Sequence, residues 1–325
     1  MTEPLEMRTT RPMAVHGGTS TTTDVWAALC ASRDGDYARF TELVSKCPAL
    51  STCQYNYTPP LHFAVREGHL GLVQDLISKG AVDPTYQTYP FLDTLPTMAR
   101  DRGHDEIADL LDAASADPVL AVKRKDTGAI DLGQTAAERR FQAAVNKGDI
   151  SGADRMLKSQ SELARNELAF WAEGILAGPA NGADIQMIEL LTEYGVRVPD
   201  VSKWAPAYYF KHYEVAAFLM ARGMNPNHRS WQEVTLLHNM AQKGNIPKAK
   251  LLLDHAANID LIDDEYHSTP LGLAVRWGQW EMAAFLLERG ADPCNSGAPW
   301  ATPLQWARKK GHTEIEMDLL KAGAH

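Results

Sequence analysis

The sequence predicts an all-α fold, a solenoid of about nine stacked helix-turn-helix repeats, from three observations. A string that starts at Thr269, TPLGLAVRWGQWEMAAFLLERGADP, returns in similar form 33 residues later from Thr302, as TPLQWARKKGHTEIEMDLLKAG. Apolar residues within each copy recur at helical spacing. Glycines stand where two helices in each copy would end. A period of this length is typical of stacked repeats, because each repeat leaves apolar faces for its neighbours to cover.

Each repeat is expected to begin with a capped inner helix. In the copy from Thr269, the threonine hydroxyl is suited to accept hydrogen bonds from the first free amides of the helix. Pro270 then occupies the first helical position, where a missing N–H costs nothing. Leu271 and Ala274 place one large and one small apolar side chain on a single buried stripe. The small side chain lets the inner helices of neighbouring repeats approach closely.

An outer helix is expected to follow each inner one. Gly278 ends the inner helix, because glycine adopts the left-handed cap conformation at little cost. Phe285, Leu286 and Leu287 supply the inward face of the outer helix, which Gly290 ends in the same way. The residues that follow, up to the next Thr-Pro start, are predicted to form a projecting turn.

Seven further stretches repeat this pattern with different fidelity. The clearest are TPPLHFAVREGHLGLVQDLISKGAVDP, from Thr58, and TLLHNMAQKGNIPKAKLLLDHAANID, from Thr235. Together with the two copies above, they resemble the ankyrin repeat. The resemblance implies a stack of paired helices whose projecting turns and inner helices line a concave face. Less regular copies begin at Asp24, Thr94 and Arg139 or end at Pro199 and Asn227.

The pattern fails in one place, SADPVLAVKRKDTGAIDLGQTA, which has a proline, two glycines, a basic cluster and no helical period. Such a stretch is typical of a long connection, either a linker between blocks or an insertion that lies across the surface. The start of the chain is polar and rich in threonine, as in a flexible tail. The predicted organisation is therefore a tail (1–23), N-terminal repeats (24–114), a linker or insertion (115–136) and C-terminal repeats (137–325).

Composition and charge exclude several classes of function. The 325 residues are 45% hydrophobic and 22% charged, as in globular proteins, and the net charge of −9 argues against a general nucleic-acid or membrane-surface binder. No apolar run approaches the roughly 18 residues of a membrane-spanning helix. The start lacks a secretory signal layout, and the cysteines show no metal-binding or paired spacing, so reduced thiols and a cytoplasmic location are expected. These cysteines are Cys30, Cys47, Cys53 and Cys294.

Candidate chemical sites are few. The sequence DDEYH, from Asp263 to His267, gathers carboxylates beside a histidine, but it lacks calcium-loop spacing and a second ligand cluster. We therefore expect no metal and no cofactor. No catalytic motif is present, which favours a non-enzymatic role. Six of the eleven histidines fall at places where the resemblance implies a structural role: His62, His69, His104, His212, His238 and His312.

A partner-binding site is predicted on the concave face. In the ankyrin pattern, the projecting turn and the two residues before the first glycine line this face. Aromatic and basic residues gather at these places, and such residues dominate binding interfaces. Their mixture suits a protein partner that presents an extended acidic segment with apolar anchors. The candidates are Tyr209, Phe210, Trp231, Gln232, Lys243, Tyr266, His267, Arg276, Trp277, Trp300, Lys309 and Lys310; core packing is an equal alternative for the first two.

Two other functions are compatible with the sequence. Irregular sequence such as KWAPAYYFKHY is able to open a cavity that a regular array would close, which predicts a small-molecule or enzyme pocket at about 204–306. The residues from Asp263 to His267 would then supply polar groups. The chain is alternatively the accessory subunit of an enzyme, which is compatible with protein binding.

Overall fold

The computed structural model describes residues 1–117, 119–120, 130, 133–164, 170 and 173–325. Two compact units follow from the contacts between residues. The N-terminal unit comprises Leu5–Leu132, and the C-terminal unit comprises Gly133–His325 together with Met1–Pro4. The segment predicted as a linker or insertion, 115–136, falls largely outside the described residues.

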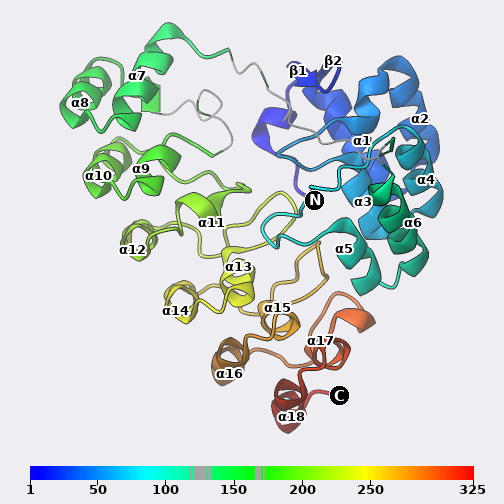
Figure 1. The fold of residues 1–325 in the computed structure, drawn as a ribbon. Coiled ribbons are helices and arrows are strands. Elements are labelled where there is room, and N and C mark those ends of the chain that lie inside the picture. The colour runs from blue at the N-terminus through cyan, green and yellow to red at the C-terminus, as the bar shows by residue number, and fades with distance from the viewer. Residues whose placement is uncertain (118, 121–129, 131–132, 165–169, 171–172) are drawn as a thin grey trace. The chain divides into compact units, whose positions relative to one another are not determined.

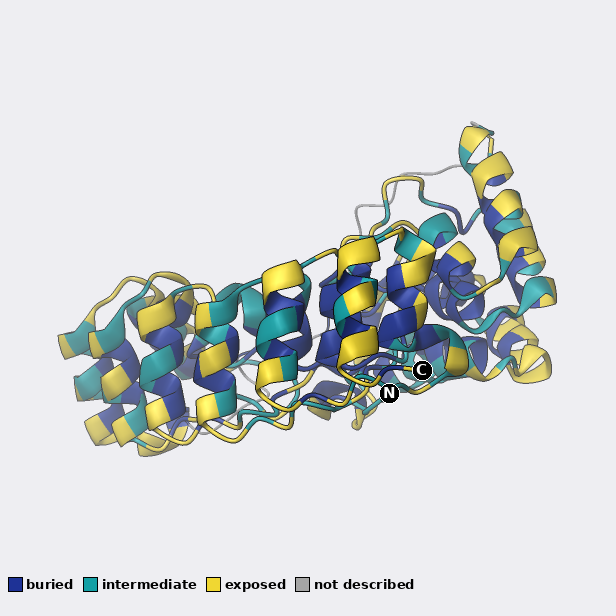
Figure 2. Ribbon diagram, turned by 90° about the horizontal axis from the view of Figure 1, so that it is seen from below, coloured by how far each residue is buried: buried dark blue, intermediate teal, exposed yellow. Residues whose placement is uncertain are grey.

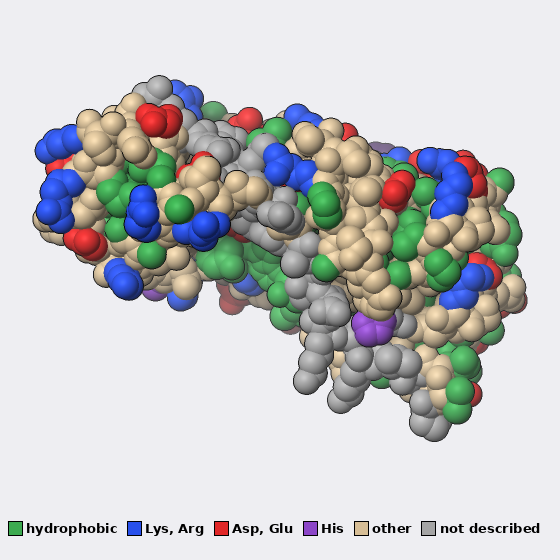
Figure 3. Space-filling model, turned by 90° about the horizontal axis from the view of Figure 1, so that it is seen from above, with side chains coloured by type: hydrophobic (Ala, Val, Ile, Leu, Met, Phe, Trp, Pro, Cys, Tyr) green, Lys and Arg blue, Asp and Glu red, His purple; other side chains and the backbone are tan. Residues whose placement is uncertain are grey.

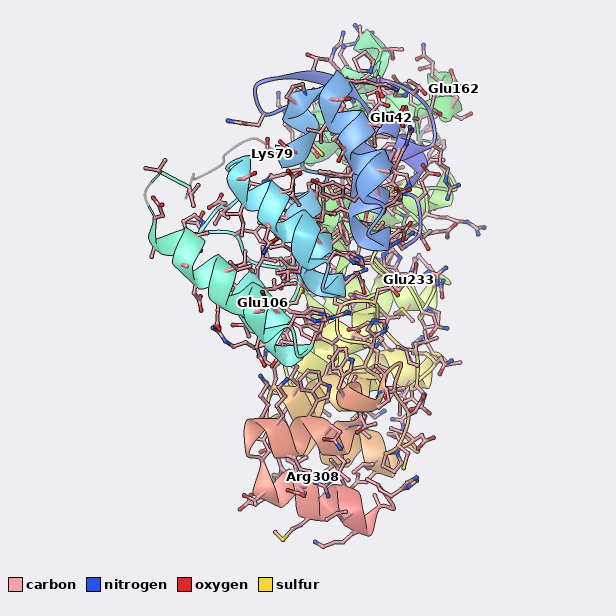
Figure 4. The ribbon with its side chains drawn as sticks, turned by 90° about the vertical axis from the view of Figure 1, so that its right-hand side faces the viewer. Glu42, Lys79, Glu106, Glu162, Glu233 and Arg308 are labelled. Atoms are coloured by element: carbon pink, nitrogen blue, oxygen red, sulfur yellow. The ribbon has the colours of Figure 1, made fainter. Side chains whose placement is uncertain are left out.

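Three pairs of helices build the N-terminal unit (Figure 1). The inner helices α1, α3 and α5 pack side by side, and α4 packs against α6 on the outer side. Glu42, Lys79 and Glu106 mark α2, the end of α4 and α6 in Figure 4. The helices are α1 (Thr22–Asp34), α2 (Tyr37–Lys46), α3 (Pro60–Glu67), α4 (Leu70–Ser78), α5 (Leu95–Asp101) and α6 (Asp105–Ala116), with the short 3-10 helices η1 (Leu5–Met7) and η2 (Pro48–Thr52).

Six more pairs build the C-terminal unit, with the even-numbered outer helices following one another along one side in Figure 1. The first four pairs are α7 (Ala136–Asn146) with α8 (Ile150–Ser159), α9 (Ala177–Asn181) with α10 (Ile185–Glu193), α11 (Ala205–Tyr208) with α12 (Tyr213–Ala221), and α13 (Leu236–Gln242) with α14 (Ile246–Asp254). The last two are α15 (Pro270–Arg276) with α16 (Trp280–Glu288) and α17 (Pro303–Lys310) with α18 (Thr313–Lys321); η3 (Ser161–Ala164) and η5 (Pro299–Ala301) are short 3-10 helices.

The described residues thus contain nine helix pairs, and the predicted all-α solenoid is confirmed. Figure 2 shows outer helices with one exposed side and one buried side, as amphipathic packing requires. The buried stripe predicted in the repeat from Thr269 is present, because Leu271 and Ala274 are both 0% exposed. Within the described part of the chain, every helix is too short or too polar to cross a bilayer.

The segment expected as a flexible tail contains regular structure. Strands β1 (Pro12–Val15) and β2 (Gly18–Thr21) form an antiparallel hairpin that leads directly into α1. Met13 and Val15 alternate with exposed neighbours and are buried, which gives the hairpin an apolar side that the polar composition of the tail conceals. The first residues pair with the C-terminal unit, where the Thr2 amide donates to the Trp231 carbonyl at 2.9 Å.

Three inner-helix starts in the C-terminal unit follow the predicted capping chemistry. The Thr269 side chain accepts a hydrogen bond from the Gly272 amide, and Thr302 accepts one from Gln305. Thr235 forms a full capping box. Its side-chain oxygen accepts a hydrogen bond from the His238 amide, and the His238 ring accepts one from the Thr235 amide. These caps fix where the inner helices begin.

Side chains after the inner helices connect neighbouring repeats. The His69 ring, through Nε2, lies 2.8 Å from the Arg33 carbonyl of the preceding repeat, and His212 Nε2 lies 3.1 Å from the Asn181 carbonyl. Gln279 takes the same place in a later repeat and donates to the Gln242 carbonyl at 2.9 Å. Each bond satisfies a carbonyl at a helix end, which stabilises the stack.

Candidate partner-binding site

The projecting turns before α15 and α17 are tied to each other. Asp263 Oδ1 accepts hydrogen bonds from the amides of Tyr266 at 2.8 Å and Ser268 at 3.4 Å, so this carboxylate shapes the turn from inside. Ser268 pairs with Ser296 in an antiparallel bridge, and the Gly297 amide donates to the His267 carbonyl at 2.7 Å. The positions of the aromatic side chains on these turns are therefore set before any partner arrives.

Arg276, at the end of α15, lies among three aromatic rings. Its guanidinium carbon is 3.9 Å from the centre of the Trp277 ring, 4.2 Å from that of Tyr266 and 5.4 Å from that of Trp306. Tyr266 meets Trp277 edge-on at 5.5 Å and Trp306 at 6.1 Å. A guanidinium in this position is attracted to the electron-rich ring faces. We call Tyr266, Arg276, Trp277, Trp300 and Trp306 the aromatic cluster.

Trp306 is the side chain of this cluster that sequence reasoning missed. It is 0% exposed, and its indole N–H donates to Ser268 Oγ at 2.8 Å. Trp300 meets it edge-on at 5.8 Å and meets His267 at 5.9 Å. The register supplies a signal that identifies it, because Trp306 occupies the place of the buried Leu273 in the preceding repeat.

The predicted site residues separate by exposure. Lys243 and Lys309 are exposed, whereas Lys310, His267, Trp277 and Trp300 are half-buried. A protein partner is able to contact only side chains of these two kinds without rearrangement. The remaining predicted residues are buried supports: Tyr209, Phe210, Trp231, Gln232, Tyr266 and Arg276.

Buried charges lie beneath the earlier turns of the C-terminal unit. Lys203 is 3% exposed, and its ammonium lies 5.8 Å from the ring centres of both Trp204 and Trp231. Burial lowers the pKa of Lys203 to about 7, while the carboxylates of Glu265 and Glu173 act in the opposite direction. No local pattern indicates that Lys203 is buried, because its carboxylate neighbours, Glu173 and Glu265, lie 30 or more residues away in the sequence.

Glu173 holds Tyr209 in its buried position. The Tyr209 hydroxyl donates to the Glu173 carbonyl, and the Ser202 hydroxyl donates to the Glu173 carboxylate. The Trp204 amide donates to the same carboxylate at 3.3 Å. Gln232 is held in a similar way, since its amide nitrogen donates to Glu265 Oε1 at 2.7 Å. Tyr209 and Gln232 therefore have structural hydrogen bonds that fix the turns.

The surface charge is mixed rather than of one sign. On the face drawn in Figure 3, Lys and Arg side chains alternate with Asp, Glu and hydrophobic side chains. Among the described residues, no group of three or more His, Cys, Asp or Glu side chains is arranged to hold a metal ion. The geometry defines a repeat protein with a preformed surface of aromatic and basic side chains.

Comparison with known families agrees with this class. A model of three consecutive ankyrin repeats matches residues 205–297, and a single ankyrin repeat matches residues 57–89. The chain therefore contains ankyrin repeats.

The curated relatives match only part of this chain. The human transient receptor potential cation channel subfamily A member 1 is 31% identical over 110 residues, which are 34% of this chain and 10% of the channel. The human ARF GTPase-activating protein GIT1 is 33% identical over 26% of this chain and 11% of that protein. The rat palmitoyltransferase ZDHHC17 is 33% identical over 30% of this chain and 16% of its own length. The matches thus span about a tenth to a sixth of these relatives.

One solved structure is similar to part of this chain. The ankyrin repeat domain from Acinetobacter baumannii AYE covers 58% of this chain and 100% of its own, with 23% sequence identity and a TM-score of 0.49.

Proposed function

We propose that this chain is a scaffold that binds a protein partner through the inner-helix ends and projecting turns of its last three repeats. The partner presents an extended acidic segment with apolar side chains. Ankyrin repeats are in general protein-protein interaction scaffolds. The relatives named above carry such repeats beside unrelated activities, so a repeat array does not itself specify chemistry.

The arrangement of Arg276 supports this proposal most directly. Its guanidinium lies 3.9 Å from the Trp277 ring centre, which leaves Trp277 half-buried beside a fixed positive charge. Binding hot spots are enriched in tryptophan and arginine, because each buries much area at a modest entropic cost. The cluster pairs both residue types at one inner-helix end.

Rigidity is the proposed mechanism. The turn bonds through Asp263 and Ser268 hold the aromatic side chains in place, so little conformational entropy is lost when a partner docks. Lys309 and Lys310 lie at the end of the next inner helix, within 5.9 Å of the Trp306 ring centre. They provide the positive charge that an acidic segment requires, and such pairing mainly accelerates association.

The partner is first captured from a lysate of the source cell with the tagged full chain. The affinity of the purified partner for the chain is then measured by calorimetry. Lys309→Glu with Lys310→Glu should weaken binding at least about tenfold, because two charges are reversed at the proposed contact. Adding salt should weaken wild-type binding in the same direction.

The matched control carries the same change in charge on outer helices, as Lys250→Glu with Lys321→Glu. Binding should then stay within about twofold of wild type. Equal losses in the two double variants would mean that the partner responds only to net charge. No loss in either would refute an acidic contact at α17.

A cytoplasmic location belongs to the same proposal. Cys47, Cys53 and Cys294 carry free thiols, as a reducing compartment favours. Burial raises the pKa of the Cys53 thiol, which keeps it protonated and unreactive. Immunofluorescence of the full chain tests this location, and a secreted or organellar signal would contradict it.

A further inference from the structure

A cavity of about 710 Å³ lies in the irregular part of the C-terminal unit. It is bordered by the ends of α10 and α12 and by the loops that follow them, 195–200 and 222–228. Pockets of roughly 300–1,000 Å³ are typical of sites for small organic ligands. The sequence predicted a pocket at about 204–306 with polar groups from Asp263 to His267, but none of those five residues lines this cavity.

The inner wall is apolar. Leu176, Val196, Leu219 and Met224 line the cavity and are each less than 9% exposed. They belong to neighbouring repeats, so the wall is built where two repeats meet. Apolar lining of this kind contributes binding free energy without selecting a particular chemical group.

His228 adds a polar group to this wall. It is 2% exposed, and burial lowers its pKa to about 4, so the ring is neutral at physiological pH. The ring is hydrogen-bonded to the Ser202 backbone, while its Nε2 atom is buried with no hydrogen-bond partner among the described residues. A buried polar atom without a partner costs free energy, which a ligand that supplies a hydrogen bond would recover.

One side of the cavity rim is suited to a positively charged group of a ligand. Glu193 and Asp200 line the cavity and are exposed. The C-termini of α10 and α12 both border the cavity, since Thr192 and Glu193 are the last residues of α10 and Arg222 directly follows α12. The C-terminal end of a helix dipole is negative. An ammonium group is stabilised by both features.

Arg197 supplies the opposite charge. It is exposed, lines the cavity, and lies on the loop between Glu193 and Asp200. Arg222 contributes less, because it already pairs with Glu189 at 3.0 Å and lies over the Phe218 ring. A planar guanidinium such as that of Arg197 is suited to hold a carboxylate in a bidentate manner.

We infer that this cavity binds a short free peptide whose ammonium faces Glu193 and Asp200, whose carboxylate pairs with Arg197, and whose interior N–H groups reach His228. The cavity volume exceeds that of a single amino acid and accommodates about three residues. This site is separate in sequence from the proposed partner surface on the last three repeats, so each is tested without the other.

Calorimetry with the full chain tests the inference. Trialanine and trileucine with free ends are compared with trialanine that is acetylated at the amino end and amidated at the carboxyl end. At least one free peptide should bind with one-to-one stoichiometry below about 1 mM, and capping should weaken trialanine binding about tenfold or more. Trp277→Ala should leave these affinities unchanged.

Variants separate the roles of the two charges. Arg197→Ala should remove the preference for a free carboxylate, so free and amidated trialanine bind alike. Asp200→Asn should reduce the preference for a free amino end. Arg155→Ala, an exposed change on α8 away from the cavity, is the matched control and should leave both preferences unchanged.

His228→Phe removes the buried acceptor and should abolish binding, provided circular dichroism shows a folded chain. If that variant unfolds, the exposed Arg197 and Asp200 variants still decide the question. The inference is overturned if no free tripeptide binds at about 1 mM, if capped and free peptides bind equally, or if Arg155→Ala acts like Arg197→Ala.

Discussion

The ring of His69 occupies the space beside Gly35 that a side chain would need. A Cβ atom on Gly35 would stand 2.6 Å from His69 Cε1, closer than real contacts allow. Gly68 and His104 have the same relationship in the next repeat, at 2.5 Å. The glycine that ends one inner helix thus makes room for the histidine of the following repeat. The two positions are coupled across the stack rather than within a repeat.

Gly35→Ala should therefore destabilise the chain through two effects. Gly35 has φ +67°, where an alanine costs about 1 to 2 kcal/mol. Overpacking against His69 adds at least about 1 kcal/mol and disturbs its bond to the Arg33 carbonyl. Gly80→Ala is the control, because Gly80 has φ +69° but no atom within 4 Å of its Cβ position. Equal losses in urea unfolding would refute the coupling.

Leu271→Ala should destabilise by about 2 to 5 kcal/mol, because it leaves a cavity between α15 and its neighbours. Leu271 is 0% exposed, whereas Leu320 on α18 is 47% exposed and serves as the control. Leu320→Ala should change the free energy of unfolding by less than about 1 kcal/mol. A thermal melt of Leu271→Ala that coincides with wild type would show that the stacking register is wrong.

Stability should fall as the solution is acidified, partly through His238. Burial lowers the pKa of His238 to about 4 in the folded chain, against an ordinary value of 6.5. The unfolded chain takes up the proton first, so the stabilisation is complete above about pH 6.5 and is lost as pH falls toward 4. The shift corresponds to about 3 kcal/mol.

His238→Gln does not titrate and should lose less stability than wild type between pH 7 and pH 4.5 in urea unfolding. The comparison isolates this residue, since both chains share the same carboxylates and His228. Parallel pH profiles for the two chains would contradict the role assigned to its burial.

Trp277→Ala should cost less than about 1 kcal/mol of stability, because the half-buried side chain is not needed for stacking. Circular dichroism melts against Trp280→Ala, whose side chain is 46% exposed on α16, measure this directly. A loss above about 3 kcal/mol for Trp277→Ala alone would place this tryptophan in the core.

The regular repeats were predictable because their helix starts and ends follow local chemistry. Thr269 and Thr302 cap their helices as the sequence indicates. The spacing between repeats then locates the corresponding helices in the other copies. The supports of the candidate site depend on longer-range contacts. The buried Tyr209 donates a hydrogen bond to the Glu173 carbonyl. A local sequence pattern does not predict a contact between residues 36 positions apart.

The same limit applies to exposure on the turns. Trp231 and Tyr266 occupy turn positions that the ankyrin pattern assigns to the concave face, yet they are 1% and 0% exposed. The Asp263 carboxylate points into the turn and accepts a hydrogen bond from the Tyr266 amide. The sequence does not distinguish such a carboxylate from one that faces solvent. Alternating burial at Pro12–Val15 was likewise hidden by the polar composition of the N-terminal segment around it.

The most direct test of the partner surface is calorimetry of the captured, purified partner with Trp277→Ala beside Trp280→Ala. Trp277 follows the last residue of α15, and Trp280 is the first residue of α16. Trp277→Ala should weaken binding at least about tenfold, while Trp280→Ala should stay within about twofold of wild type. Equal affinities for the two variants, or a greater loss for Trp280→Ala, would contradict docking at the aromatic cluster.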